Sequence, residues 1–349
     1  ANFHQTLETP TFRQTLIYNS RGMHDTDHLP AKPAATFRIL MLGDSFVQAL
    51  QVAEAQTAHQ VLENDLNEAA AGPPLTYQVL SAGVGRWGTG QQLVYYRQEG
   101  RNFQPDLVLL LLYLGNDISD NLPGNGATLT GVNCYAPYFA ICQGRLVPAP
   151  LAYAPGLSTR QNECSSGQRA LVNALGAIYQ HSRLYQHLEP LFSTRAPPFG
   201  AAFDNNFYLA LYAAEEEPAL TQAWQVTLKT IARLQREVAA DGARLGLVLI
   251  SPYLVVEIRR QPAELQQVLF EQAAAFDGVD VDRPNRRLAQ FLTDHQIPFL
   301  DLTEAMVSRQ NRDPAPLYIY GDGHWTVEGN RYAAELIAGW LREQALVPQ

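Results

Sequence analysis

The chain has 349 residues, of which 46% are hydrophobic and 17% are charged. A chain of this length and composition can bury a large core, and it is neither a disordered nor a coiled-coil sequence. The 25 lysines and arginines against 34 aspartates and glutamates give a formal net charge of −9. Because surfaces that bind nucleic acid need concentrated positive charge, this balance argues against nucleic acid as the partner.

The longest apolar run covers residues 107–114 and is bounded by Pro105 and Gly115. It is much shorter than the ~20 apolar residues that cross a bilayer, so we expect no membrane span in this chain. Its length and flanking turn residues predict a buried parallel strand instead. The sequence begins at Ala1 without a signal peptide, as a processed or truncated product would too, so its start does not decide the compartment.

Predicted strands alternate with predicted helices over most of the chain. Residues 1–35 show no periodicity and predict an irregular lead-in. After it we expect strands at 37–42, 77–80, 107–113, 244–250 and 297–300, and helices at 57–69, 91–100, 220–240 and 327–345. This alternation predicts one α/β domain over residues 36–349, with a central parallel sheet and right-handed crossovers.

Residues 118–219 interrupt the alternation after the third predicted strand. They are rich in glycine, proline, asparagine and aromatic residues, and they are too many for a plain connection. Because the segment leaves the carboxyl edge of the sheet, we interpret it as an inserted cap or lid-like region. The alternative is an element that serves only packing or oligomer formation.

Three cysteines, Cys134, Cys142 and Cys164, lie in this inserted region. None has a partner at the spacing of a metal site, and no CxxC motif occurs, so zinc is not expected. A Cys134–Cys142 or Cys142–Cys164 disulfide is an expectation for an exported protein. Three small buried thiols are the alternative.

A Gly-Asp-Ser motif ends at Ser45, directly after the predicted strand at 37–42 and before a segment that could open a helix. A serine at a strand-to-helix turn lies at the carboxyl end of the sheet, where open α/β folds bind their ligands. This context predicts a nucleophile, whereas an isolated serine at a helix start would be interpreted as an N-cap. A serine hydroxyl needs a base that removes its proton during attack.

His324 is the candidate base, and Asp322 is the candidate carboxylate that orients its ring and stabilises the imidazolium. Because one residue separates them, their side chains can meet only in a local turn, which Gly321 and Gly323 permit. The alternatives are that Asp322 caps the last helix, or that Asp301 is the orienting carboxylate. The other seven histidines lack such a setting and are interpreted as structural or solvated.

Four short segments, in this order, resemble the motifs of the SGNH hydrolases, also called GDSL lipases and esterases. They are residues 42–46 (LGDSF), 81–89 (SAGVGRWGT), 115–117 (GND) and 322–324 (DGH). The resemblance implies a three-layer, flavodoxin-like α/β fold and a reaction without a cofactor. It also implies that Ser45 is the nucleophile, with Asp322 and His324 as its partners.

The resemblance further implies an oxyanion hole formed by the Ser45 backbone N–H, the Asn116 side chain and a backbone N–H of the second segment. The usual asparagine and donor glycine of that segment align with Ser81 and Arg86. Because a backbone N–H does not depend on the side chain, Arg86 can donate, and Gly85 is the competing assignment.

Asp44 and Asp117 neighbour these groups and are interpreted as hydrogen-bond acceptors of turns. They could hold a metal ion only with a third ligand, which the sequence does not suggest, so no metal is expected.

The last segment continues as Asp-Gly-His-Trp, with Trp325 expected to pack under the histidine loop, and resembles members related to alginate O-acetyltransferases. We expect a serine esterase that hydrolyses carboxylic esters, with small acyl groups on alcohols or sugars, through a Ser45 acyl-enzyme. The first alternative is an O-acyltransferase that passes the acyl group to a carbohydrate hydroxyl. The second is an inactive carbohydrate-binding or surface module. The resemblance favours an extracytoplasmic location, with the cytoplasm as the alternative, and it predicts no oligomeric state.

Overall fold

The computed structural model describes residues 3–69, 75–122, 137–149, 207–274 and 278–348. The chain begins with an antiparallel hairpin of β1 (Phe3–Glu8) and β2 (Arg13–Tyr18), in which Thr6 pairs with Thr15. The expectation of an irregular lead-in was therefore wrong for these residues. Most of the hairpin's side chains are exposed, so no buried face leaves an apolar alternation in the sequence.

Five parallel strands form the central sheet. Their spatial order is β4 (Thr76–Gly83), β3 (Thr36–Gly43), β5 (Leu107–Tyr113), β8 (Arg244–Ile250) and β9 (Phe299–Asp301). Numbered along the chain, this is the order 2-1-3-4-5 of flavodoxin-like sheets. The predicted fold class is thereby confirmed, and β5 and β8 have the predicted bounds.

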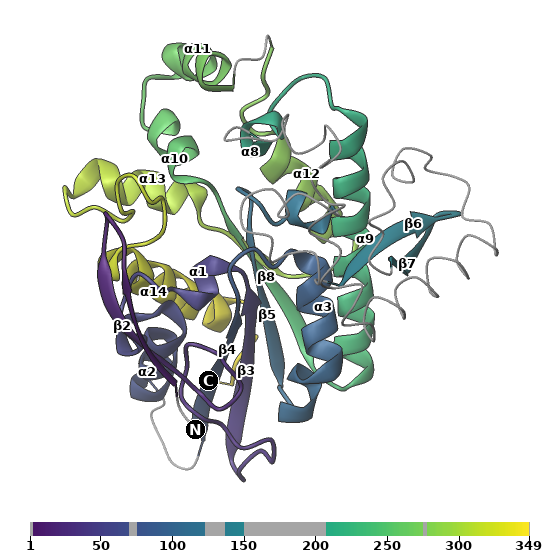
Figure 1. Cartoon of the computed structure of the whole chain (residues 1–349), viewed down its shortest axis with the longest axis vertical. Helices are drawn as coiled ribbons and strands as arrows, with labels where there is room; N and C mark the ends of the chain where they lie inside the picture. Colours follow the sequence, from purple (N-terminus) through teal and green to yellow (C-terminus); the bar gives the residue numbers. More distant parts are fainter. Residues whose placement is uncertain (1–2, 70–74, 123–136, 150–206, 275–277, 349) are drawn as a thin grey trace, which may run out of the picture.

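Helices cover both faces of the sheet and make three layers (Figure 1). One face packs against α3 (Thr89–Gln98), α9 (Pro218–Ala240) and α12 (Arg283–Asp294), and the other against α2 (Ala58–Ala69), α13 (Thr303–Arg312) and α14 (Val327–Glu343). Alternate residues of β3 supply the two cores: Leu40 and Leu42 lie in the first, and Ile39 and Met41 in the second. Successive side chains of a strand point to opposite faces, so an apolar run such as β3 is buried on both.

Smaller elements gather beyond the sheet. The segment between β8 and β9 includes α10 (Tyr253–Arg259) and α11 (Ala263–Ala274) besides α12. Within the predicted insertion, the structure contains the antiparallel hairpin β6 (Tyr138–Cys142) and β7 (Arg145–Ala149), and the short helix α8 (Phe207–Ala210). Most of the insertion lies outside the described residues, so its lid-like role stays a prediction.

Of the three cysteines, Cys142 alone lies among the residues that the structure describes. Cys142 is buried at the end of β6. Cys134 and Cys164 lie outside the described residues, so neither disulfide pairing is tested.

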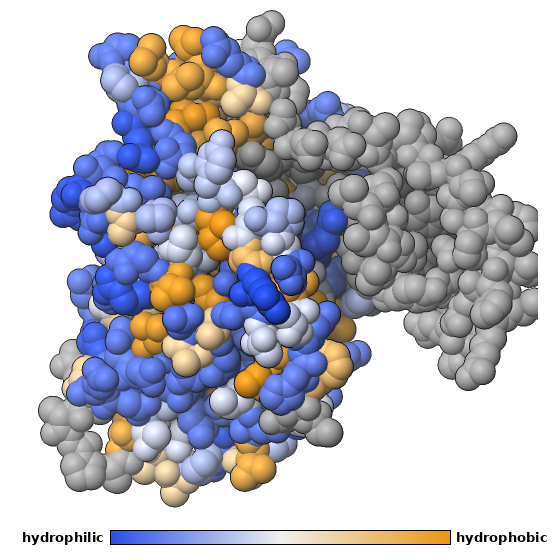
Figure 2. All heavy atoms as spheres, turned by 60° about the vertical axis from the view of Figure 1, so that its left-hand side comes forward, coloured by the Kyte–Doolittle hydropathy of each residue, from blue (hydrophilic) through white to orange (hydrophobic). Residues whose placement is uncertain are grey.

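The surface seen in Figure 2 is mainly hydrophilic, with hydrophobic areas between the polar ones. The largest of these lies at the upper end, where Figure 1 places α11, a helix that exposes Leu265 and Val268. No helix within the described ranges is long and apolar enough to cross a membrane.

Candidate active site

The turn that carries Ser45 is sharp and tightly packed. β3 ends at Gly43, and α1 (Ser45–Gln48) begins two residues later with Asp44 as its N-cap. The Asp44 carboxylate accepts a hydrogen bond of 2.9 Å from the Phe46 backbone N–H. A Cβ atom at Gly43 would lie 2.3 Å from Val47 Cγ2, so a larger residue would displace the helix start. The turn therefore fixes Ser45 at the carboxyl edge of the sheet, as predicted.

The loop that carries His324 reaches the same edge from the other end of the chain. Gly321 and Gly323 adopt φ of 81° and 85°, the left-handed region that favours glycine. A backbone bridge between Tyr318 and Trp325 closes the loop just before α14. These turns let the Asp322 and His324 side chains meet although one residue separates them.

A chain of short contacts joins the three side chains. His324 Nδ1 lies 2.7 Å from Asp322 Oδ1, and His324 Nε2 lies 2.8 Å from Ser45 Oγ. An ionised carboxylate can only accept, so Nδ1–H donates to Asp322, and Nε2 of the neutral ring accepts from the Ser45 hydroxyl. The structure thus brings together the three residues that the sequence predicted, in the arrangement that activates a serine.

The charge of Asp322 suits this arrangement. Burial raises the pKa of Asp322, but the hydrogen bonds and charge of His324 together lower it below its ordinary value. The carboxylate is therefore ionised at neutral pH and can hold the ring in one tautomer. Asp44 lies near the same hydroxyl, with Oδ2 3.3 Å from Ser45 Oγ, and burial raises its pKa.

Aromatic rings pack against one another beneath the loop that carries His324. The Phe46 ring lies 5.0 Å from the His324 ring and 5.0 Å from the Trp325 ring, the second contact being edge-on. Trp325 is 2% exposed. Trp325 therefore packs under the loop, as expected, and cannot stack on a substrate.

The loop that follows β4 lies beside the serine. A Cβ atom built on Gly85 would be 3.8 Å from Ser45 Cβ. The Gly85 N–H donates a 2.9 Å hydrogen bond to Gln48 Oε1, so its use in an oxyanion hole would require the Gln48 side chain to turn away. Arg86, the competing candidate, adopts a left-handed φ of 68° in the same turn.

Asn116 follows β5, the neighbour of β3, and so lies at the same edge of the sheet. Its Nδ2 donates to Asp120 Oδ2 at 2.5 Å. An amide group carries two N–H donors, so this bond uses one of them. Asp120 was not singled out by the sequence, because only the fold of the following turn brings it to Asn116.

Asp117 and Asp301 have structural partners. Asp117 accepts from the Tyr113 backbone N–H at 2.9 Å, as expected for a turn acceptor. Asp301, the alternative orienting carboxylate, accepts from the Thr303 backbone at 3.0 Å and from Asn285 at 2.7 Å. The carboxylate that contacts His324 is Asp322.

Gln48 is a residue of this region that the sequence did not identify. Its backbone oxygen lies 2.9 Å from His24 Nδ1, and its side chain accepts from Gly85. It therefore connects the N-terminal segment to the loop beside Ser45. Both partners are distant in sequence, so no local motif announces this role.

The comparisons with known proteins agree with the motifs. Residues 210–349, roughly two-fifths of the chain, match the model of the SGNH hydrolase-like domain of the acetyltransferase AlgX. This match includes Asp322 and His324 and ends well short of Ser45 on the N-terminal side. Among curated proteins, none matches the chain.

Several solved structures are similar at low identity. A GDSL-like lipase from Bacteroides thetaiotaomicron is 12% identical, with 88% of this chain and 88% of that chain covered and a TM-score of 0.39. A catalytic mutant of Axe2, an acetylxylan esterase from Geobacillus stearothermophilus, is 13% identical, with 88% and 93% covered and a TM-score of 0.42. This structural similarity is weak, and the likeness to the family model and its motifs is the more specific one. Residues 210–349 are therefore similar to the SGNH hydrolase-like domain of the AlgX acetyltransferase type.

Proposed function

We propose that this protein transfers an acyl group through an ester formed on Ser45 Oγ. The observation that carries the proposal is the contact chain from Ser45 Oγ to His324 Nε2 at 2.8 Å and from His324 Nδ1 to Asp322 at 2.7 Å. A hydroxyl, a base and an orienting carboxylate in this order are the groups that acyl transfer through a covalent intermediate requires.

In the first half-reaction, Ser45 Oγ attacks the carbonyl carbon of an ester while His324 Nε2 takes the hydroxyl proton. The C–O bond to the donor alcohol then breaks, and His324 returns the proton to the departing oxygen. Asp322 stabilises the imidazolium between these two steps. In the second half-reaction, His324 takes the proton of an acceptor hydroxyl while the acceptor oxygen attacks the acyl carbon. The bond from that carbon to Ser45 Oγ then breaks, and His324 returns the proton to Ser45 Oγ.

For the negative charge on the carbonyl oxygen we propose the Asn116 amide as a donor, because the bond to Asp120 uses only one of its two N–H groups. The loop of Gly85 and Arg86, which lies beside Ser45, would supply a backbone N–H. Preorganised donors of this kind stabilise the charge that develops in the transition state.

We further propose that the acyl group is acetyl and that the acceptor is a carbohydrate hydroxyl. The family of the matching model is an acetyltransferase, and the match covers the loop that holds Asp322 and His324. Sequence motifs alone placed hydrolysis first, and the family match moves the preference to transfer.

Hydrolysis remains the second candidate because of one observation. The side chains of His324 and Asp322 are 25% and 19% exposed, so water has access to the groups that would activate it. The two reactions share the acyl-enzyme and differ only in the acceptor.

The test uses p-nitrophenyl acetate with and without a neutral oligosaccharide, and mass spectrometry of the enzyme and the sugar. We expect acetyl-Ser45, acetylated sugar, and a loss of roughly 10⁴-fold or more in Ser45→Ala. Ser308→Ala, a change at an exposed serine of α13, is the matched control and should keep full activity. Free acetate as the sole product would establish hydrolysis instead, and a folded wild type that never acylates would refute both.

A further inference from the structure

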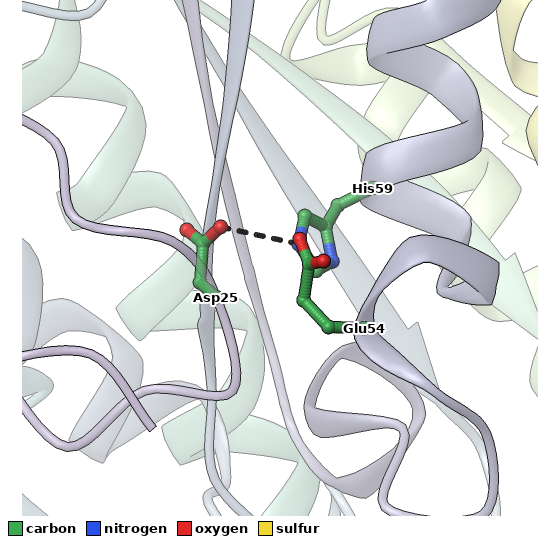
Figure 3. A group of neighbouring side chains, drawn as sticks. All are labelled: Asp25, Glu54 and His59. Carbon is green, nitrogen blue, oxygen red and sulfur yellow. Dashed lines mark ion pairs between the residues drawn. The ribbon is translucent and has the colours of Figure 1, made fainter. Parts of the chain in front are cut away.

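A second group of carboxylates and imidazole lies outside the site just described. Asp25, Glu54 and His59 each offer one ligand atom, and these atoms lie within 4.8 Å of one another. Asp25 belongs to the segment after β2, Glu54 opens the 3-10 helix η1 (Glu54–Gln56), and His59 lies in the first turn of α2. Figure 3 shows the Asp25 and Glu54 carboxylates converging on the His59 ring.

Asp25 and His59 are buried, Glu54 is half-buried, and the group is partly preorganised. Asp25 is 3% exposed and His59 is 1% exposed, with Asp25 Oδ1 3.3 Å from His59 Nε2. Backbone N–H groups of Thr26 and Ser81 donate to the two Asp25 oxygens at 2.7 and 2.9 Å. These bonds hold the Asp25 carboxylate in place independently of any ligand.

Two buried atoms of the group have no hydrogen-bond partner among the residues described: His59 Nδ1 and Glu54 Oε1. A carboxylate oxygen can only accept, and a neutral imidazole has one nitrogen that only accepts. The group therefore contains buried lone pairs without a donor, a situation that native proteins usually avoid. A cation between the Asp25 and Glu54 carboxylates and Nε2, the ring nitrogen that faces Asp25, would supply what the Glu54 oxygen lacks.

We propose that Asp25, Glu54 and His59 bind one divalent cation, with Zn²⁺ as the best match. One imidazole nitrogen and two carboxylate oxygens are a ligand set that zinc accepts, and a water molecule would complete a tetrahedral site. The two carboxylate charges balance the charge of the ion, which favours its burial. The three ligands include no cysteine, so a search for cysteine-based spacing does not find this site.

The position of the site indicates a positioning role for the ion. It joins the N-terminal segment to the connection between α1 and α2, while Asp25 also holds the β4 backbone at Ser81. The neighbouring His24 contacts the backbone of Gln48, the last residue of α1. The ion would thus hold residues 49–59, which follow the helix that begins at Ser45, against the N-terminal segment. It would not contact a substrate.

The experiment measures zinc stoichiometry and melting temperature of the whole chain after treatment with a chelator and addition of ZnCl₂. We expect one Zn²⁺ per chain and a higher Tm, with Mg²⁺ and Ca²⁺ giving a smaller rise. Glu54→Gln should weaken Zn²⁺ binding by roughly tenfold or more and remove the rise in Tm, and His59→Gln should do the same. His295→Asn, at an exposed histidine, is the control for adventitious binding and should behave as wild type.

Glu54→Gln decides the outcome if His59→Gln does not fold, because a glutamine of the same shape at a half-buried position leaves the core intact. Circular dichroism of each apo variant establishes that it is folded. A wild type that binds zinc no better than Glu54→Gln, or whose Tm zinc does not change, would overturn the proposal.

Discussion

Two carboxylate–imidazole pairs in this protein use the same chemical groups in opposite surroundings. In the Asp322–His324 pair the atoms are 2.7 Å apart, the side chains are 19% and 25% exposed, and the second ring nitrogen contacts Ser45. In the Asp25–His59 pair the atoms are 3.3 Å apart, the side chains are 2% and 1% exposed, and the second ring nitrogen has no partner in the described ranges. A pair can activate a nucleophile only where its free nitrogen meets one within reach of substrate. The same groups, once buried, can serve stability or hold an ion.

Asp322→Asn tests the half-buried pair of Asp322 and His324 and should have the largest effect. An asparagine can donate to Nδ1 and so favours the wrong tautomer, which leaves a proton on the nitrogen that must accept from Ser45. We expect kcat/KM for p-nitrophenyl acetate to fall by about 10⁴-fold, the loss typical of this change in serine enzymes. The melting temperature should change little, since the loop is closed by backbone bonds.

Asp301→Asn is the matched control for that variant. Asp301 is also an aspartate at the sheet edge, but its partners are Thr303 and Asn285. It should keep its activity per folded molecule. Equal losses of activity in the two variants would mean that Asp322 has no special role.

Asp25→Asn tests the buried pair, and stability is the expected readout. The change weakens the hydrogen bonds that the buried carboxylate accepts from the Thr26 and Ser81 backbone, which we expect to cost about 3 kcal/mol of unfolding free energy, measured by urea at pH 7 with a chelator present. Burial raises the pKa of Asp25, but hydrogen bonds from His28 and His59 and their charges lower it well below its ordinary value.

The lowered pKa of Asp25 determines how the free energy of unfolding changes with pH. A carboxyl with a depressed pKa stabilises the fold above its unfolded pKa, and this contribution is lost as the pH falls toward the folded value. Wild type and Asp25→Asn should therefore converge as the pH falls below 3.8, the ordinary value. A constant difference in stability from pH 7 to pH 3 would contradict the assignment.

The two pairs also differ in how far the sequence predicts them. Ser45 and His324 stand out because each lies beside a recognisable element, a buried strand or the last helix, and glycines announce the turns. Parallel strands bring such segments to one edge, so their meeting can be inferred. Asp25, Glu54 and His59 come from a lead-in without periodicity, a short 3-10 helix and a helix start. Only the tertiary structure places them together.

The same reasoning explains which parts of the fold were missed. Strands such as β5 and β8 are continuous apolar runs, whose bounds the sequence marks clearly. The hairpin of β1 and β2 has mostly exposed side chains, and the bond of Gly85 to Gln48 depends on a side chain from another element. Backbone pairing between exposed strands and long-range polar contacts produce no periodic pattern of hydrophobic residues in the sequence, so they could not be predicted from it.

Asn116→Ala removes a proposed oxyanion donor and leaves Ser45, His324 and Asp322 in place. It therefore separates the contribution of the oxyanion donor from that of the Asp322–His324 pair. We expect kcat to fall by about 10²-fold with little change in KM, because the donor acts on charge that develops in the transition state. Steady-state kinetics with p-nitrophenyl acetate measures this. Asn64→Ala, at an exposed asparagine of α2, is the control. A change confined to KM would instead indicate a role in binding the ground state.

The smallest effect is expected from Asp117→Asn, which tests how the pKa of this buried carboxyl makes the stability of the fold depend on pH. Burial raises the pKa of Asp117, and the charge of Asp44 raises it further. A raised pKa means that the group favours the fold below its unfolded pKa and that this contribution is lost as the pH rises. Asparagine keeps an acceptor for the Tyr113 N–H and cannot ionise, so the variant should lose less stability than wild type between pH 4 and pH 8, on the order of 1 kcal/mol. Melting temperatures across this range measure the difference, and a variant that becomes less stable than wild type as the pH rises would show that ionised Asp117 is needed by the fold.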